Sequence, residues 1–333
     1  MEKETLKFTP RTDLAIEIGA LLKEEHDDDN YEIEGVQIDT NTQPVFKKTH
    51  ITILNEAGAS AMGKPVGHYI TLESQELKEN DPEAHKKIIQ EVSETIKSLL
   101  PKTKETLNVL VVGLGNRQAT PDTLGPYVTD KVLVTRHIAQ FVPEAIDESV
   151  CHLSSIAPSV MGLTGVETSE IVKGVASHIK PDCIIAIDAL GSRSASRINT
   201  TIQISNTGIS PGAGIGNKRK QLNEETVGCP VIAIGVPTVV DAATLVNDTM
   251  DCLIENMMME TDNNALLNML NDLGQQEKYS LIQEVITPVM GNLFVTPKDI
   301  DEVIVYLGNV IANAINIAVH PGITINDVNK YRY

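Results

Sequence analysis

Aromatic residues and cysteines are scarce in this chain, and both scarcities narrow its class. It has no Trp among 333 residues and only 3% aromatic residues, so Leu, Ile and Val must fill its core. The four cysteines, Cys151, Cys183, Cys229 and Cys252, are widely spaced and include no Cys-x-x-Cys pair. This spacing does not fit a zinc finger, and it favours buried, reduced thiols.

Positive charge is also scarce. The chain has 27 Lys and Arg against 45 Asp and Glu, a formal net charge of −18. Proteins that bind a phosphate backbone gain affinity from Lys and Arg, so this balance argues against direct binding of nucleic acid. We find no apolar run approaching the ~20 residues that span a bilayer, and no signal-peptide pattern at the N-terminus. The sequence therefore predicts a cytoplasmic protein with no membrane partner.

Several common catalytic motifs are missing as well. The eight histidines show no His-Glu-x-x-His spacing, and no Gly-x-Ser-x-Gly nucleophile elbow occurs. Gly113-Leu-Gly115 lacks the third glycine of a dinucleotide fingerprint, because that position is Gln118. The glycine-rich residues 212–218 lack the Gly-Lys-Ser/Thr ending of a P-loop. The sequence predicts neither a cofactor nor a resident metal ion.

The apolar pattern indicates an α/β protein. Three apolar runs, Asn108–Val112, Cys183–Ile187 and Pro230–Ile234, alternate with helical patterns, as in parallel strands covered on both faces. Residues 31–74 alternate apolar and polar side chains, as antiparallel strands do. The expected helices cover residues 13–22, 87–100, 123–141, 167–180, 239–257, 265–274, 277–287 and 297–319.

Two aspartates follow strand-like runs at their carboxyl ends. Active sites of open α/β sheets lie at the carboxyl ends of strands, so Asp122 and Asp188 can meet in one crevice. Asp122 also has a structural interpretation, because Thr120-Pro121-Asp122 suits the first turn of a helix. Asp188 is harder to explain in that way, since an acid directly after four apolar strand residues is partly buried and needs a partner.

A pair of close carboxyl groups is sufficient for peptide hydrolysis. Two carboxylates held together cannot both ionise, so one keeps its proton. The ionised group then takes a proton from water, and the protonated group polarises the scissile carbonyl. Because one member must be protonated, mild acidification is expected to favour the reaction.

Five phrases together resemble the germination proteases of spore-forming bacteria: residues 113–126, 184–192, 199–205, 214–220 and 235–241. The resemblance places the catalytic pair at Asp122 and Asp188. It implies a three-layer α/β/α fold with a mainly parallel sheet, similar to the hydrogenase-maturating endopeptidases, and an N-terminal antiparallel β-rich portion. It also implies a homotetrameric endopeptidase of the forespore and spore core, which degrades small acid-soluble spore proteins during germination.

The same resemblance implies a zymogen that removes its own prosegment. The family cleaves after an acidic residue that precedes a large apolar residue and Ala, and Asp13-Leu14-Ala15 has that pattern. We expect self-cleavage between Asp13 and Leu14. The chain would then comprise a prosegment (residues 1–13), an N-terminal helix and β-rich portion (14–104), and an α/β catalytic core with C-terminal helices (105–333).

Lys218, Arg219 and Lys220 form a basic cluster in this acidic chain. Such a cluster is ordinarily a solvated surface, but within the crevice it would bind the acidic residue before the scissile bond. Two other functions stay open. One is a metal-dependent peptidase of the hydrogenase-maturation type, in which equivalent acids contact a metal. The other is a noncatalytic α/β protein whose glycine-rich loops bind a small anion.

Overall fold

The computed structural model describes residues 12–26, 31–147, 149–212, 219–260, 281–282, 284–285 and 293–327. The strands are β1 (Val36–Thr42), β2 (Lys47–Ile53), β3 (Gly67–Glu73), β4 (Asn108–Gly113), β5 (His152–Ile156), β6 (Cys183–Ser192), β7 (Thr201–Ser205), β8 (Val231–Asp241) and β9 (Phe294–Val295). The helices are α1 (Ala15–Glu25), α2 (Glu56–Met62), α3 (Pro82–Leu99), α4 (Leu124–Thr129), α5 (Arg136–Phe141), α6 (Met161–Thr164), α7 (Thr168–Ile179), α8 (Glu224–Val227), α9 (Ala242–Glu260) and α12 (Ile300–Val319). Four short 3₁₀ turns are η1 (Gln75–Lys78), η2 (Thr120–Asp122), η3 (Pro143–Ala145) and η4 (Ala195–Arg197).

All strands of the described residues belong to one sheet, in the order β1-β2-β3-β7-β8-β6-β4-β5, with β9 paired to β8. The strands β5, β4, β6 and β8 pair in parallel with one another, whereas β8 is antiparallel to β7 and β9. Strands β7, β3, β2 and β1 extend the sheet with antiparallel pairing. This confirms the predicted α/β class, with a parallel core and antiparallel N-terminal strands. The predicted portions 14–104 and 105–333 share this sheet.

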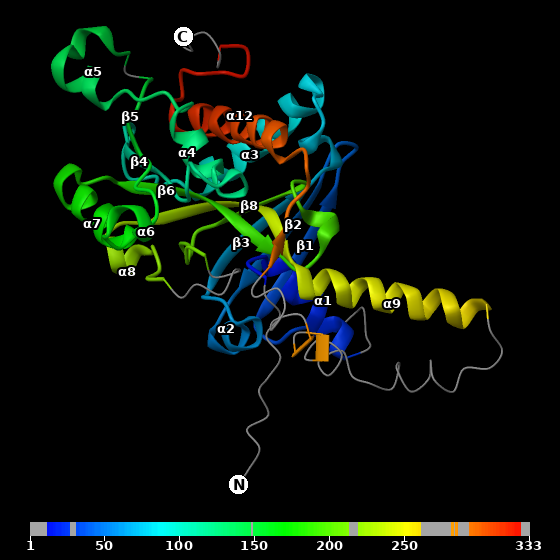
Figure 1. The fold of residues 1–333 in the computed structure, drawn as a ribbon. Helices are drawn as coiled ribbons and strands as arrows, with labels where there is room; N and C mark the ends of the chain where they lie inside the picture. The colour runs from blue at the N-terminus through cyan, green and yellow to red at the C-terminus, as the bar shows by residue number, and fades with distance from the viewer. Residues whose placement is uncertain are drawn as a thin grey trace.

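One face of the sheet is covered by α3, α4 and α12 (Figure 1). Successive side chains of a strand point to opposite faces, so every second residue of the central strands enters this core. The strand residues of this apolar core include Ile70, Leu72, Val109, Val111, Leu153, Ile185, Ile187, Ile202, Ile204, Ile232 and Ile234. Most of the side chains of α12 are buried here as well.

The opposite face carries two separate apolar clusters. Helices α7 and α8 pack over the parallel strands, and α1 and α2 pack over the antiparallel strands (Figure 1). The first cluster contains Leu110, Ile184 and Val172, and the second contains Ile51 and Ile53. The polar residues of the candidate site point to this face.

The strands β6 and β8 are longer than their apolar runs. They remain paired as far as Ser192 and Val240, so their backbone hydrogen bonds continue after the apolar residues end. Asp188 consequently lies inside β6, which corrects the prediction that it ends a strand. The predicted helix over residues 123–141 is also wrong as one element. Helix α4 ends at Thr129 and α5 begins at Arg136, and between them the Leu133 amide donates to Asn316 of α12 at 2.8 Å.

Other elements had no clear sequence signal. Strands β5 and β7 and the short helices α2 and α8 were absent from the prediction. The predicted helices at residues 265–274 and 277–287 lie almost entirely outside the described residues. Three cysteines are buried as predicted, whereas Cys252 is exposed, so the prediction is wrong for that thiol.

Helix α12 departs from one further expectation. Contrary to the sequence interpretation, it is long and apolar enough to cross a membrane by length and composition. However, 78% of its most apolar window is buried inside the protein, where it packs against α3 and α4. Its apolar character is explained by that core position.

Candidate functional site

Asp188 occupies a buried position on the polar face of β6. The neighbouring Ile187 belongs to the core under α12, so Asp188 points the other way. It is 4% exposed, and its Oδ1 accepts a hydrogen bond from the Ala189 amide at 3.0 Å. Burial raises the pKa of Asp188 well above its usual range, and the nearby charges of Asp122 and Asp13 raise it further.

Asp122 reaches the same place from the loop after β4. Gly115 has a φ of +116°, and a Cβ there would lie 2.1 Å from the Asp122 carbonyl oxygen, so glycine permits this close approach. The Asn116 amide donates to that oxygen at 2.9 Å. Gly125 of α4 also packs closely, since its Cβ would lie 2.2 Å from the Leu114 carbonyl oxygen and 2.7 Å from the Ile187 carbonyl oxygen. These contacts place η2 beside β6.

The two acids have different electrostatic surroundings. Burial raises the pKa of Asp122 to about 6, although a backbone hydrogen bond from Asn116 and the charge of Arg219 oppose the increase. The structure thus brings Asp122 and Asp188 into one site, in which burial raises the pKa of both carboxyl groups and the Asp122 charge raises that of Asp188 further. The alternative helix-capping role is not seen at Thr120, because η2 has no side-chain cap and its N-cap position is Ala119.

The segment around Asp13 is docked against the end of β6. The Asp13 amide donates to the Gly191 carbonyl at 3.1 Å, and the Gly191 amide donates to Asp13 Oδ2 at 2.9 Å. The Leu14 amide donates to Thr12 Oγ1 at 3.0 Å. The side chains of Leu14 and Ala15 are both 0% exposed. The predicted cleavage junction therefore lies within the fold as a bound peptide.

Two side chains that the sequence analysis did not identify contact the Asp13 carbonyl oxygen. Lys64 Nζ lies 3.0 Å from it, and Gln203 Nε2 lies 3.2 Å from it. Gln203 Oε1 also accepts from the Ala15 amide at 2.7 Å. A sequence signal existed for Gln203 alone, because it is a polar residue between Ile202 and Ile204 in a buried strand. Lys64 follows Gly63 in a polar segment, and nothing in the local sequence indicated that its side chain is partly buried.

Glu17 anchors the helix that follows the junction. It is 2% exposed and accepts hydrogen bonds from the backbone amides of Arg193, at 2.7 Å, and Ser194, at 2.9 Å. The Arg197 guanidinium adds an ion pair at 3.4 Å. A buried carboxylate needs such partners, and together they hold the start of α1 against the loop after β6.

The three residues of the basic cluster, Lys218, Arg219 and Lys220, have different surroundings. Lys218 lies outside the described residues. The charge of Arg219 lowers the pKa of both Asp122 and Asp188, in each case less than burial raises it. The side chain of Lys220 is exposed and pairs with Glu170 of α7 at 3.3 Å. Of the two cluster residues that the structure describes, Arg219 and Lys220, only Arg219 affects the pKa values of the two aspartates.

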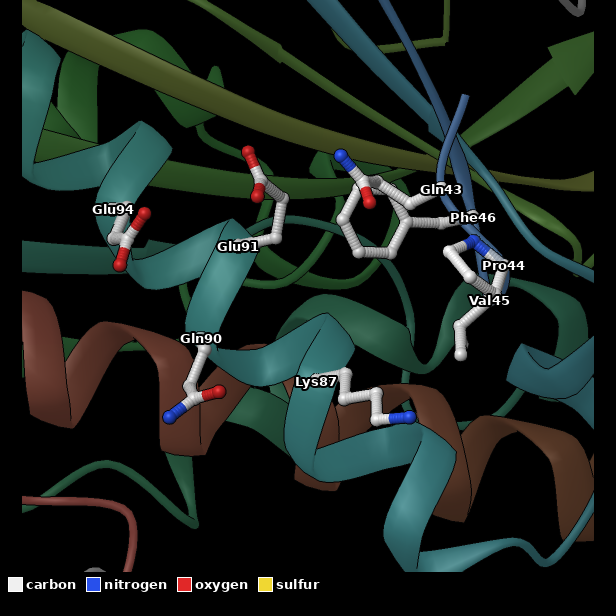
Figure 2. A pocket seen from close by; sticks show the side chains of 8 residues that line it. All are labelled: Gln43, Pro44, Val45, Phe46, Lys87, Gln90, Glu91 and Glu94. Carbon is white, nitrogen blue, oxygen red and sulfur yellow. The ribbon is translucent and has the colours of Figure 1, made fainter. Parts of the chain in front are cut away.

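A surface pocket of about 400 Å³ lies elsewhere, between the β1–β2 turn and α3. Figure 2 shows its lining residues, which are Gln43, Pro44, Val45, Phe46, Lys87, Gln90, Glu91 and Glu94. This pocket is on the α3 side of the sheet, whereas Asp188 and Gln203 point to the other side. In the part of the chain that the structure describes, no group of three or more His, Cys, Asp or Glu side chains has the geometry of a metal site.

Comparison with known proteins identifies the family. The sequence profile described as "Germination protease" matches residues 15–265 and 254–332. The germination protease of Clostridium tetani is 46% identical over 96% of this chain and 98% of its own length. The Bacillus cereus protein is 41% identical over 98% of both chains. A solved NiFe hydrogenase maturation protease from Thermococcus kodakarensis is 16% identical, with a TM-score of 0.27 over 43% of this chain and 80% of its own. The chain belongs to the germination protease family and is a peptide-bond hydrolase.

Proposed function

We propose that this chain is a zymogen that cleaves its own Asp13–Leu14 bond and then cleaves small acid-soluble spore proteins, with Asp122 and Asp188 as the catalytic pair. The observation that carries this proposal is the docked junction. Asp13 is bound to Gly191, three residues along β6 from Asp188. Its charge also raises the pKa of Asp188, so the peptide and the catalytic pair are close.

The two carboxyl groups suit complementary roles. Asp122, with a pKa of about 6, is ionised near neutral pH and is the general base that takes a proton from water. Asp188 keeps its proton because burial and the negative charges beside it oppose ionisation, and it is the general acid. The arrangement resembles other carboxylate pairs that hydrolyse peptide bonds with one shared proton.

The docked residues also support the proposed specificity. Leu14 and Ala15 are completely buried, so the site accepts a large apolar residue followed by a small one. The Asp13 carboxylate accepts a hydrogen bond from the Gly191 amide. We propose Arg219 as a second group that binds the acidic residue. Lys218 and Lys220 remain weaker substrate-binding proposals, because Lys220 is paired with Glu170.

The cellular assignment follows the family. The proposed substrates are the small acid-soluble proteins that coat spore DNA, and the proposed location is the cytoplasm of the forespore and the spore core. We propose a homotetramer of the processed chain, with residues 14–104 and 105–333 as its two portions. A net charge of −18 supports contact with the protein substrates rather than with the DNA itself.

The decisive experiment measures self-cleavage of the purified full-length chain by intact mass spectrometry after a pH step. We expect loss of residues 1–13 and a new N-terminus at Leu14, together with the appearance of activity on a spore-protein peptide. The Asp13→Ala chain should retain its N-terminus and stay inactive. If the uncut Asp13→Ala chain digests the peptide as fast as a chain that starts at Leu14, the prosegment is not inhibitory.

The same assay separates the alternatives. A metal-dependent peptidase of the hydrogenase-maturation type would lose activity with a chelator and regain it with a divalent metal. A noncatalytic anion-binding protein would keep residues 1–13 under every condition. We expect neither result.

A further inference from the structure

We propose that Lys64 and Gln203 are catalytic residues that hold the carbonyl oxygen of the scissile peptide bond and stabilise the negative charge it acquires during hydrolysis. This inference rests on the proposed cleavage between Asp13 and Leu14. Its basis is geometric: Lys64 Nζ and Gln203 Nε2 lie 3.0 and 3.2 Å from the Asp13 carbonyl oxygen. Donors placed at this oxygen form an oxyanion site.

The orientation of the Gln203 amide is determined by its two partners. The Ala15 amide can only donate, so the atom 2.7 Å from it must be the Gln203 oxygen. The nitrogen then faces the Asp13 carbonyl, which can only accept. Gln203 therefore clamps the peptide on both sides of Leu14. Because both contacts are to backbone, the same clamp can hold any substrate that enters in this register.

The sheet register places Gln203 opposite the catalytic pair. Gln203 of β7 and Asp188 of β6 are both paired with Gly235 of β8. They point to the same face and are separated by two strand spacings, roughly 9–10 Å. Gly235 has no side chain of its own, and the Leu190 side chain covers it on this face. The Asp13 carbonyl is contacted from the Gln203 side of this face.

Lys64 is aimed by the end of α2. Gly63 adopts a left-handed conformation, with φ of 58°, and the Lys64 amide donates to Ala59 at 3.2 Å, which ends the helix. The ammonium then lies 5.9 Å from the centre of the Tyr69 ring and donates to Asp13. Burial lowers the pKa of Lys64, while the Asp13 charge opposes that change. A desolvated cation stabilises a new negative charge more strongly than a hydrated one.

The proposed step is balanced without a further reactant. Asp122 takes a proton from water as the water oxygen bonds to the Asp13 carbonyl carbon, and the carbonyl electron pair moves to the oxygen held by Lys64 and Gln203. That pair then re-forms the carbonyl, the bond from carbon to the Leu14 nitrogen breaks, and the nitrogen receives the Asp188 proton. The products are the Asp13 carboxyl group and the Leu14 amine. The carbonyl donors are thus separate from the proton-transfer pair.

The first test measures the rate of self-cleavage in full-length variants. Lys64→Met removes one donor, and Gln203→Glu keeps the acceptor for Ala15 but removes the donor to Asp13. We expect each to slow cleavage by about 10²- to 10³-fold, as loss of one oxyanion donor does. The loss for Gln203→Glu should be smaller in acid, because a protonated Glu can donate. Lys64→Arg should recover part of the rate.

Lys48→Met is the matched control. Lys48 is also a partly buried lysine with partners, Glu91 at 2.6 Å and Thr95 at 3.2 Å, but it faces α3. Its replacement should change the cleavage rate less than about twofold, in keeping with an ion pair remote from the reaction. Thermal unfolding of every variant monitors the fold. Folded Lys64→Met and Gln203→Glu chains that cleave as fast as the Lys48→Met chain would overturn the proposal.

A second measurement does not depend on cleavage. In an Asp188→Asn chain with ¹³C-carbonyl Asp and ¹⁵N Leu, only the Asp13–Leu14 and Asp272–Leu273 bonds give correlated NMR signals. Lys64→Met should move the Asp13 carbonyl signal upfield and leave the Asp272 signal in place. An unchanged Asp13 signal would overturn the proposal. If the wild-type chain never removes residues 1–13, the self-cleavage proposal fails, and the carbonyl signal still decides the role of Lys64.

Discussion

The two faces of the central strands differ in chemical character at neighbouring residues. Ile187 and Asp188 are consecutive residues of β6, yet one packs in the apolar core under α12 and the other belongs to the polar site. Ile204 and Gln203 of β7 show the same contrast. Because side chains alternate along a strand, one step along the chain crosses from core to site. Packing on the apolar face thus fixes the strand backbone that positions the polar side chains of the site.

The two faces also respond differently to pH. The isoleucines do not titrate, whereas the folded state holds the Asp188 proton more tightly than the unfolded state does. That contribution to stability is complete below the unfolded pKa of Asp, and it is lost as the pH rises toward the raised folded pKa. The polar face therefore lowers the free energy of unfolding at neutral pH. This is the energetic cost of placing a proton donor in the site.

The strongest test of the contrast compares neighbouring substitutions in β6. Asp188→Asn should slow self-cleavage by at least about 10³-fold, because it removes the general acid while keeping nearly the same shape. Its free energy of unfolding at neutral pH should not fall, since Asn has no buried charge to form. Asp122→Asn should be equally damaging through loss of the base. The measurements are the appearance of the Leu14 N-terminus and chemical denaturation.

Ile187→Val is the control on the other face. It should reduce the free energy of unfolding by about 0.5–1.5 kcal/mol and leave the cleavage rate nearly unchanged. Near-normal turnover in a folded Asp188→Asn or Asp122→Asn chain would remove that residue from the catalytic role. A large loss of cleavage in a folded Ile187→Val chain would show that the two faces are not separable.

Much of this organisation was predictable from local sequence. The apolar runs of β4, β6 and β8 identified the parallel core, and the alternation of residues 31–74 identified the antiparallel strands. The family resemblance then named both aspartates. The extension of β6 past Asp188 was not predictable, because it depends on continued pairing with β8 rather than on apolar side chains. The apolar periodicity of a segment indicates which of its residues are buried. It does not indicate how far the segment pairs with a neighbouring strand.

The carbonyl site was harder still. Lys64, Gln203 and Asp13 are far apart along the chain, and only the crossing of the N-terminal segment over β7 brings them together. The sequence interpretation assigned carbonyl polarisation to the protonated aspartate, which stays a prediction. In the structure, the oxygen of Asp13 is contacted by Lys64 and Gln203. Contacts between distant segments depend on the tertiary fold, so no local sequence motif predicts them.

The second test uses pH to sharpen the contrast between the faces. With Asp122 as the base, the cleavage rate should fall about tenfold per unit below its pKa of about 6. The rate should also fall in alkali, where Asp188 loses its proton, so the profile should be bell-shaped. Acidification then favours cleavage only down to about pH 6. The two apparent pKa values of this profile belong to the pair of aspartates and not to either residue alone.

Single-turnover rates by intact mass across the pH range give this profile. The Ile187→Val chain should show the same profile, because its substitution lies on the face that does not titrate. A rate that continues to rise tenfold per unit below pH 5 would contradict the assignment of Asp122 as the base. A rate that is flat across the range would remove both aspartates from the titration.

The smallest expected effect concerns Arg219 and Lys220, which are adjacent in sequence but differ in their surroundings. Arg219 acts electrostatically on both aspartates, whereas Lys220 pairs with Glu170 at 3.3 Å on an exposed surface. In the processed chain, Arg219→Met should reduce cleavage of a peptide with Glu before the scissile bond by about tenfold, which corresponds to ~1.4 kcal/mol for a charge-assisted contact. Its effect on the matching Gln peptide should be smaller, since Gln carries no charge. Lys220→Met should change either rate less than about twofold, because exposed ion pairs contribute little. Equal losses for the Glu and Gln peptides in Arg219→Met would mean that Arg219 acts on the aspartate pair rather than on the substrate carboxylate.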